Sequence, residues 1–423
     1  MAATVAVAAL TAFTPATSST AAPAAPLNVT ADAVFNDPLD TTRQDTIKQK
    51  LLQLIDATRE GSEIHGSVYK FTDNDIRDAL LAAAARKVKV KMIVDGDNRT
   101  LAGGESGRLG ELNSDAYPGS SFLECPDNRG CVANRTDVTA VPGGKSSPIN
   151  HNKFFVFSET GATRNVVFQT TGNLTASQQT NYHNSAVVLP DADLYRHYRD
   201  RWERLSVHGR PEGSGLRSDY VEAPSTTGPY RVAFFPRAET DGTAWHADPA
   251  TDTVVQILRN VGCARPAGTH DTRIRIAMFA FTRPQVADEL VRLRKAGCQV
   301  YVYVNDVATS DAPGPALSDA VKSILLTGKF NQLRLCKAPA LPGLALTEVG
   351  VHTKDLLIEG TYGGDTDASV VFTGSHNYTF PNLRGNDEAL LKISDPAVYA
   401  KFEHNFDEVL DGDDGGICGT DVK

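Results

Sequence analysis

The sequence lacks several features that would place it in common classes of protein. Its 423 residues carry a formal net charge of −9, so an excess of positive charge is missing. That argues against a general nucleic-acid binder, because binding of a phosphate backbone needs clustered cations, although a small basic pocket is compatible with it. After the N-terminal stretch there is no run of about 18 apolar residues, so no membrane-spanning helix is predicted.

Three short motifs are also missing or incomplete. Gly144-Lys145-Ser146 resembles the end of a phosphate-binding loop, but Thr139 stands where the loop needs its first glycine. No G-x-S-x-G sequence occurs, which argues against a serine lipase. No C-x-x-C pair with matching histidine spacing occurs, so support for a zinc site is weak. No cofactor is expected.

The cysteines and the N-terminal stretch both favour export. Residues 1–24 are rich in alanine, threonine and valine and end in an A-x-A-like cleavage site, so we interpret them as a signal peptide, although a basic n-region is missing. A disordered N-terminal tail is the alternative. Six cysteines in a secreted chain predict three disulfides with 15 possible pairings, of which Cys125–Cys131, flanking a turn-rich segment, is the most local. We therefore expect a secreted protein.

Helix and strand patterns occur twice in the same order. Each copy reads as amphipathic helix, strand, helix, valine-rich strand, a long variable region, and then further strands and a final helix. Strands that alternate with helices indicate an α/β fold, here two similar domains, each a mixed sheet flanked by helices. We predict an N-terminal domain over 25–206, a Gly/Pro/Ser-rich linker over 207–229 and a C-terminal domain over 230–423. The variable regions, 96–148 and 307–350, are expected to form surface loops and binding rims.

Two H-x-K sequences carry the chemistry. They are His151-Asn152-Lys153 and His352-Thr353-Lys354, and none of the other eight histidines begins an H-x-K. Each leads into an apolar run of strand character, where residues i and i+2 share a face. An imidazole and an ammonium side by side suit a tetrahedral anion, because the ammonium holds an oxygen while the imidazole attacks or protonates.

An asparagine follows each H-x-K by 22 to 25 residues, and this order resembles the phospholipase D superfamily, including its secreted bacterial-type members. The second copy matches well through Gly374-Ser375-x-Asn377 and Glu388, and the first more loosely through Gly172-Asn173. The acid that the family places five residues after the lysine is Ser158 in one copy and Glu359 in the other. The family's late glutamate, Glu388, is matched with Ala186 in the first copy, so His151 lacks acidic neighbours in sequence.

The resemblance implies that both motifs meet at one site. One histidine would form a phosphohistidine and the other would protonate the leaving alcohol; we assign His151 and His352 to these roles, with the reverse left open. Lys153, Lys354, Asn173 and Asn377 would hold the phosphate oxygens in place of a metal. Ser375 and Glu388 would support them, although Ser375 as a turn former and Glu388 as a solvated charge are open alternatives. Both asparagines also lie in N-x-T sequons.

The function implied is a monomeric, metal-independent phospholipase D. It would act on phospholipid at a membrane or micelle surface, release phosphatidate and the head-group alcohol, and transfer the phosphatidyl group to other alcohols. Stable nucleic-acid binding is not expected. The alternatives are a nuclease of the same superfamily and an inactive duplicate that serves as a binding module.

Overall fold

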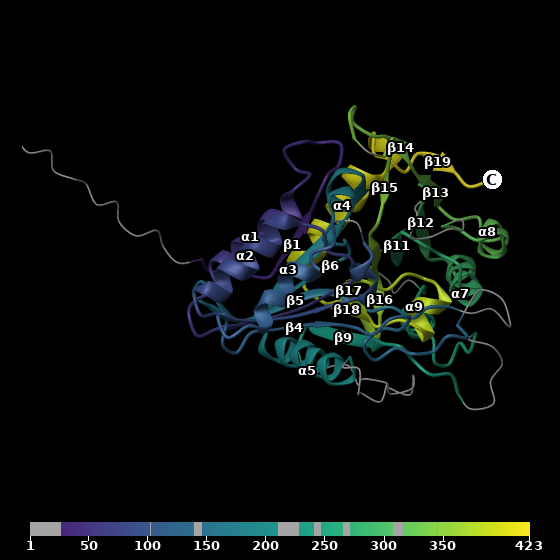
Figure 1. Ribbon diagram of the computed structural model, residues 1–423. Helices are drawn as coiled ribbons and strands as arrows, with labels where there is room; N and C mark the ends of the chain where they lie inside the picture. Colours follow the sequence, from purple (N-terminus) through teal and green to yellow (C-terminus); the bar gives the residue numbers. More distant parts are fainter. Residues whose placement is uncertain are drawn as a thin grey trace, which may run out of the picture.

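The computed structural model describes residues 27–101, 103–138, 146–209, 228–240, 247–264, 271–307, 316–344 and 346–423 (Figure 1). The predicted signal peptide and most of the predicted linker lie outside the described residues. The predicted division into domains stays a prediction, although helix α5 (Ala192–His208) continues two residues past its proposed boundary.

The first half is built on a seven-stranded mixed sheet. Its strand order is β1-β8-β6-β5-β2-β3-β4, with β1 (Asp32–Phe35), β2 (Glu63–Val68), β3 (Lys89–Val94), β4 (Ser121–Glu124), β5 (Lys153–Thr160), β6 (Thr163–Thr170) and β8 (Ser185–Pro190). Helices α1 (Thr46–Asp56) and α2 (Asn74–Ala85) cover one face. Helix α2 begins at Asp73, whose carboxylate accepts the N–H groups of Asp75 and Ile76. Apolar residues at helical spacing, among them Leu51, Leu54 and Leu80, seal this face.

The second half repeats the same arrangement. Its main sheet runs β9-β18-β17-β16-β11-β12-β13-β19, with β9 (Tyr230–Phe235), β11 (Arg273–Met278), β12 (Gln299–Asn305), β13 (Gln332–Cys336), β16 (Lys354–Tyr362), β17 (Asp365–Gly374), β18 (Glu388–Ile393) and β19 (Thr420–Asp421). A short strand, β10 (Val261–Gly262), pairs with β16. Helices α6 (Thr253–Arg259), α7 (Pro284–Lys295) and α8 (Asp319–Leu326) pack on it. The first seven strands of this order correspond one to one with those of the first sheet, which confirms the predicted pair of α/β units.

The two variable regions are more structured than expected. The first contains α3 (Ser106–Leu109), the 3₁₀ turns η1 (Gly96–Arg99) and η2 (Gly110–Asn113), and β4, which pairs with β3. The second contains α8, β13, β14 (Ala338–Pro339) and β15 (Glu348–Val351). The expectation of surface loops was therefore wrong for much of both regions, because their strands extend the sheets. Strand β15 also pairs in parallel with β7 (Tyr182–His183) of the first half.

The two sheets face each other across a shared apolar core. Side chains that alternate along the central strands meet there, including Phe154, Val156 and Val187 from the first half and Leu357, Val371 and Leu391 from the second. Helices α5 and α10 (Pro396–His404) close the sides of this core with Tyr198, Trp202 and Phe402. Complete burial of one such side chain stabilises the folded state by about 1.5–3 kcal/mol. Because both halves contribute many of them to this core, the two halves pack as one body.

All six cysteines are paired. The disulfides are Cys125–Cys131, Cys263–Cys298 and Cys336–Cys418, which confirms the three predicted bridges and the predicted local pair. The last joins Cys418, near the C-terminal end of the chain, to Cys336 at the end of β13. The chain before Cys418 forms α9 (Phe380–Arg384), α10, η3 (Asn405–Leu410) and η4 (Gly412–Asp414). Within the part of the chain that the structure describes, no helix has both the length and the apolarity needed to cross a membrane.

Candidate active site

His151 lies at the boundary between the two halves. It precedes β5 directly, and its backbone N–H donates to the Asp387 carbonyl of the other half at 2.9 Å. Its ring Nδ1 lies 2.9 Å from the carboxylate of Glu388, which opens β18. The imidazole is therefore held by a carboxylate that is 237 positions away in the sequence.

Glu388 is fully buried, and several donors converge on its carboxylate. The Ser375 hydroxyl and the Asn382 amide both donate to it, in addition to the His151 ring. An ionised carboxylate only accepts hydrogen bonds, so three donors fit its charged form. Burial raises the pKa of Glu388 well above its ordinary value, while Lys153, Ser375 and Lys354 oppose that rise.

His352 occupies the equivalent place at the start of β16, but its partner is an amide. Its Nδ1 lies 3.2 Å from Oδ1 of Asn184. Both N–H groups of that amide are used, because they donate to the carbonyls of Gln178 and Tyr182. Oδ1 of Asn184 is therefore the atom that faces the ring. A ring protonated on Nδ1 would donate to it and leave Nε2 as the reactive nitrogen.

The backbone register shows which residues of the two copies correspond. Ser375 N–H donates to the carbonyl of Ala389, and Thr171 N–H donates to the carbonyl of Ser185. Asn184 is consequently the counterpart of Glu388, and the sequence match with Ala186 was wrong. The two-residue shift arose because Asn184-Ser185 resembles Asn386-Asp387 in sequence.

Both lysines lie within the same site. Lys153 Nζ donates to the His151 carbonyl at 2.8 Å and lies 5.3 Å from the centre of the Tyr69 ring. Lys354 Nζ lies 2.9 Å from Nδ1 of His352, donates to its carbonyl, and lies 4.9 Å from the centre of the Phe279 ring. Burial, followed by the charge of Lys153, lowers the pKa of Lys354 well below its ordinary value. Each motif thus places its imidazole and ammonium together, as the alternation in strands predicted.

Burial holds both histidines in their neutral form. It is the largest cause that lowers the pKa of His151, followed by the charges of Lys153, Lys354 and His352. The pKa of His352 is lowered by burial, then by Lys354 and Lys153. Each histidine is thus affected by the lysines of both motifs, so the four side chains lie in one electrostatic environment.

Asn173 and Asn377 lie at equivalent turns, two residues after Thr171 and Ser375. Their side chains are buried, and in each the Oδ1 atom lacks a hydrogen-bond partner among the described residues. Gly374 makes the second turn possible, because its φ of 147° and its close approach to the Ala389 carbonyl exclude a side chain. Buried amides with unused hydrogen-bonding capacity are available to a bound ligand.

Ser158 and Glu359 lie away from this cluster, five residues further along β5 and β16. The Ser158 hydroxyl accepts the backbone N–H of Glu63, and Glu359 pairs with Arg273 at 3.3 Å. Both contacts are structural. The side chains at these positions therefore contact Glu63 and Arg273, not the two imidazoles.

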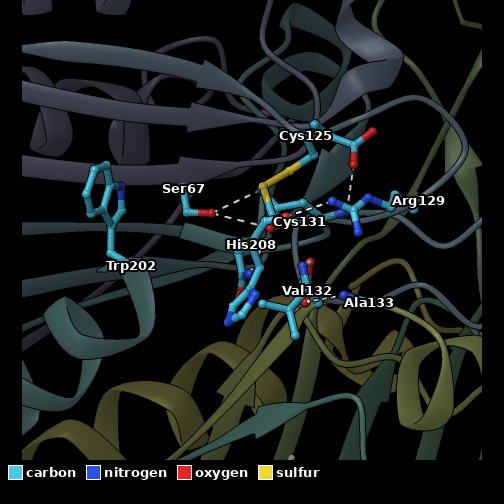
Figure 2. The surroundings of a disulfide bond; sticks show 12 residues. Ser67, Cys125, Arg129, Cys131, Val132, Ala133, Trp202 and His208 are labelled. Carbon is cyan, nitrogen blue, oxygen red and sulfur yellow. Dashed lines mark hydrogen bonds between the residues drawn. A yellow bond between two sulfur atoms is a disulfide. The ribbon is translucent and has the colours of Figure 1, made fainter. Parts of the chain in front are cut away.

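Sequence reasoning missed the residues that hold the site from the other half. Asp387 accepts the N–H groups of Val132 and Ala133 and pairs with buried Arg201 at 2.9 Å. Figure 2 shows these two backbone positions directly after the Cys125–Cys131 disulfide. Tyr69 and Phe279 flank the imidazoles. Each is followed two residues later by Phe-Thr, as Phe71-Thr72 and Phe281-Thr282, so the repeat held a signal for them.

Within the described residues, no group of three or more histidine, cysteine or acidic side chains is arranged to hold a metal ion. The positive charge at the site comes from Lys153 and Lys354. Two imidazoles, two ammonium groups and unpaired amides at the junction of duplicated halves define a class of enzyme that acts on phosphodiesters.

Comparison with protein families agrees with this class. The family described as "Cardiolipin synthase, PLD-like domain" matches residues 51–206 and 268–410. The chain therefore belongs to the phospholipase D superfamily, whose members act on phosphodiesters. No curated protein matches it.

Solved structures agree on the fold. The phosphatidylserine synthase of Haemophilus influenzae Rd KW20 is similar with a TM-score of 0.53 and 14% identity, over 86% of this chain and 84% of that one. The polyphosphate kinase of Porphyromonas gingivalis is similar with a TM-score of 0.50 and 15% identity, over 88% of this chain. This chain spans about half, 49%, of that kinase.

Proposed function

We propose that this protein is a secreted phospholipase D that cleaves the distal phosphodiester of glycerophospholipids through a phosphohistidine on His151. The observation that carries the assignment of roles is the unequal pair of partners, Glu388 at His151 and Asn184 at His352. The proposal follows from the charges that each imidazole must bear during the reaction.

In the first step Nε2 of His151 attacks phosphorus and the bond to the head-group oxygen breaks. The phosphorylated ring keeps its Nδ1–H and becomes cationic, so the Glu388 carboxylate stabilises it directly. Lys153 and Lys354, with the amides of Asn173 and Asn377, would hold the non-bridging oxygens as their charge redistributes.

His352 supplies the proton for the leaving alcohol from Nε2. The negative charge of a bound phosphodiester raises the pKa of this ring and lets it load a proton. Asn184 is neutral and adds no charge that would retain the proton. In the second step the same nitrogen removes a proton from water or an alcohol, which attacks phosphorus and releases His151.

Three observations support a phospholipid substrate and export. The matching family and the structural neighbour of similar length are both named for phospholipid synthases. The net charge of −9 disfavours a long anionic polymer. Three disulfides fit an oxidising compartment, in agreement with the proposed signal peptide. We further propose that the protein works as a monomer at a lipid surface.

Product analysis tests this function. Phosphatidylcholine or phosphatidylethanolamine incubated with the protein and ethanol should give phosphatidate and its ethyl ester, because the head group has left before the second nucleophile enters. Mass spectrometry of the lipids, with DNA in a parallel reaction, distinguishes the alternatives. Shortened DNA with intact lipid would identify a nuclease, and two unchanged substrates would identify a binding module.

A further inference from the structure

The second half carries a cavity that is distinct from the catalytic junction. It measures about 690 Å³ and lies on the outer face of the second sheet, over β9, β17 and β18 and beside α6. A cavity of about 30 Å³ beside α1 in the first half is lined instead by Asn173 and Asn184 of the catalytic junction. Helix α1 has 11 residues and α6 has 7, so the shorter helix leaves part of the sheet face uncovered.

The floor of the cavity is apolar. It is formed by side chains on the face of the sheet that α6 and α7 cover, including Ala233, Ile257, Val370, Phe372 and Leu390. Their neighbours along the same strands, such as Val371 and Leu391, face the core between the halves instead. A cavity of this size and lining is typical of a site for a small ligand with a hydrocarbon portion.

Two cations lie side by side at this cavity. Arg231 and Lys392 are directly opposite each other on the antiparallel strands β9 and β18, an arrangement that is destabilising for like charges. Lys392 is half-buried, and burial together with Arg231 lowers its pKa. Among the described residues, neither side chain forms an ion pair or a hydrogen bond; Lys392 lies 5.0 Å from the centre of the Tyr362 ring.

This charged pair is specific to the second half. The equivalent register in the first half places Asp32 opposite Val188, and Asp32 is neutralised by Lys50 and Lys401. Asp365 and Asp367 also line the cavity, but both are exposed, at the hairpin between β16 and β17. Two adjacent cations above an apolar floor are complementary to an acid that carries a hydrocarbon chain.

We propose that this cavity binds a single-chain amphiphile with an acidic head group, a carboxylate or a phosphate monoester. The head lies between Arg231 and Lys392, and the chain lies on the floor formed by Val370, Phe372 and Leu390. The site is separate from the catalytic histidines, because none of the catalytic side chains lines the cavity and Lys392 lies four residues beyond Glu388 on β18. It does not depend on the proposed lipid-cleaving activity.

Isothermal titration of the full chain with laurate tests the proposal, with dodecyl phosphate as the phosphate-headed arm. Both should bind saturably, and dodecanol and inorganic phosphate, which each lack one half of the ligand, should bind at least about tenfold more weakly. Arg231→Gln and Lys392→Gln should each weaken laurate binding by about tenfold or more, because each removes a charge-assisted contact. Arg164→Gln, at an exposed strand position of the first half that does not line the cavity, is the matched control and should bind as the wild type does.

Two further variants locate the site. Ala233→Phe fills the cavity without altering charge and should abolish binding, whereas Lys354→Gln at the catalytic junction should leave laurate affinity unchanged. Because each glutamine variant removes one of two repelling charges, its melting temperature without laurate should equal or exceed that of the wild type. Undiminished binding by Arg231→Gln and Lys392→Gln, loss in Lys354→Gln alone, or failure of the wild type to bind either amphiphile would overturn the proposal.

Discussion

Glu388 and Asn184 stand at the same register of two related strands, yet they give the two imidazoles different properties. A carboxylate beside Nδ1 stabilises a positive charge on the ring, whereas an amide provides a hydrogen bond and no net charge. The protein therefore contains one histidine suited to carrying a phosphoryl group and one suited to releasing a proton.

Exchanging these partners gives the first prediction. Glu388→Gln keeps the shape of the side chain but removes the charge, and we expect kcat to fall by roughly 10²–10⁴-fold. The pKa of His151 should fall further, so the acidic limb of the pH–rate profile should move to lower pH. Circular dichroism provides the folding control, and a profile and rate close to those of the wild type would contradict the role of Glu388.

Asn184→Asp is the matched variant in the other half. A carboxylate beside His352 stabilises its protonated form and should raise its pKa by roughly 1–3 units. Because His352 must be protonated to release the alcohol, the basic limb of the kcat profile should move to higher pH. Movement of the acidic limb instead would indicate that the two histidines have the reverse roles.

The charges of Lys153 and Lys354 give a prediction about metals. If these ammonium groups neutralise the phosphate, then EDTA should leave the rate unchanged on a soluble phosphodiester, where no lipid aggregate responds to calcium. The control is Lys354→Met, which should lose most of its activity with or without EDTA. Complete inactivation by EDTA, restored by one divalent ion, would refute this assignment.

Sequence spacing predicted the histidines, lysines and asparagines because each copy presents them on one short segment. It could not predict Glu388 as the partner of His151, since the pairing joins opposite halves and leaves no periodic signal. Asn184 was overlooked because the asparagine-containing segments of the two halves, at Asn184 and Asn386, look alike until backbone hydrogen bonds fix the register.

At the scale of elements, the loop after β4 connects a disulfide to the catalytic junction. Cys131 is followed by two backbone N–H groups that donate to Asp387, and Asp387 in turn receives the backbone N–H of His151. Of the three disulfides, Cys125–Cys131 is therefore the one whose removal should reduce the catalytic rate.

Paired cysteine-to-serine variants separate stability from catalysis. The bridges span 6, 35 and 82 residues, which corresponds to losses of about 2, 4 and 4.5 kcal/mol in the chain-entropy model. We expect Cys336–Cys418 to cost the most in the free energy of unfolding and Cys125–Cys131 to reduce kcat the most. Denaturant titration and steady-state kinetics measure the two effects, and a kcat loss that followed loop length instead would exclude the proposed coupling.

The repeated helices and central strands were predictable because their apolar periodicity is strong. The edge strands β1, β4 and β9 were not. Strands β1 and β9 pair with β8 and β18, which lie far along the chain, and β4 has only four residues. These strands form only against the completed sheet, because tertiary contacts determine the conformation of such short segments.

At the scale of the whole molecule, the duplicated sequence pattern made the fold predictable, whereas the site is formed at the interface between the two halves. The sequence shows two equal α/β units. Only packing of the two sheets through Phe154, Val371 and their neighbours shows that each imidazole is completed by the opposite unit. Neither half alone contains a histidine with its partner, so activity should require both halves.

The identity of the phosphorylated histidine tests the account most directly. A diester with a good leaving group, such as a p-nitrophenyl phosphodiester, should phosphorylate the His352→Ala variant and then stall, because water lacks its general base. Peptide mass spectrometry after a quench at alkaline pH should place the phosphoryl group on His151, and His151→Ala should remain unlabelled. A label on His352 in the wild type, or labelling of His151→Ala, would contradict the assignment built on Glu388 and Asn184.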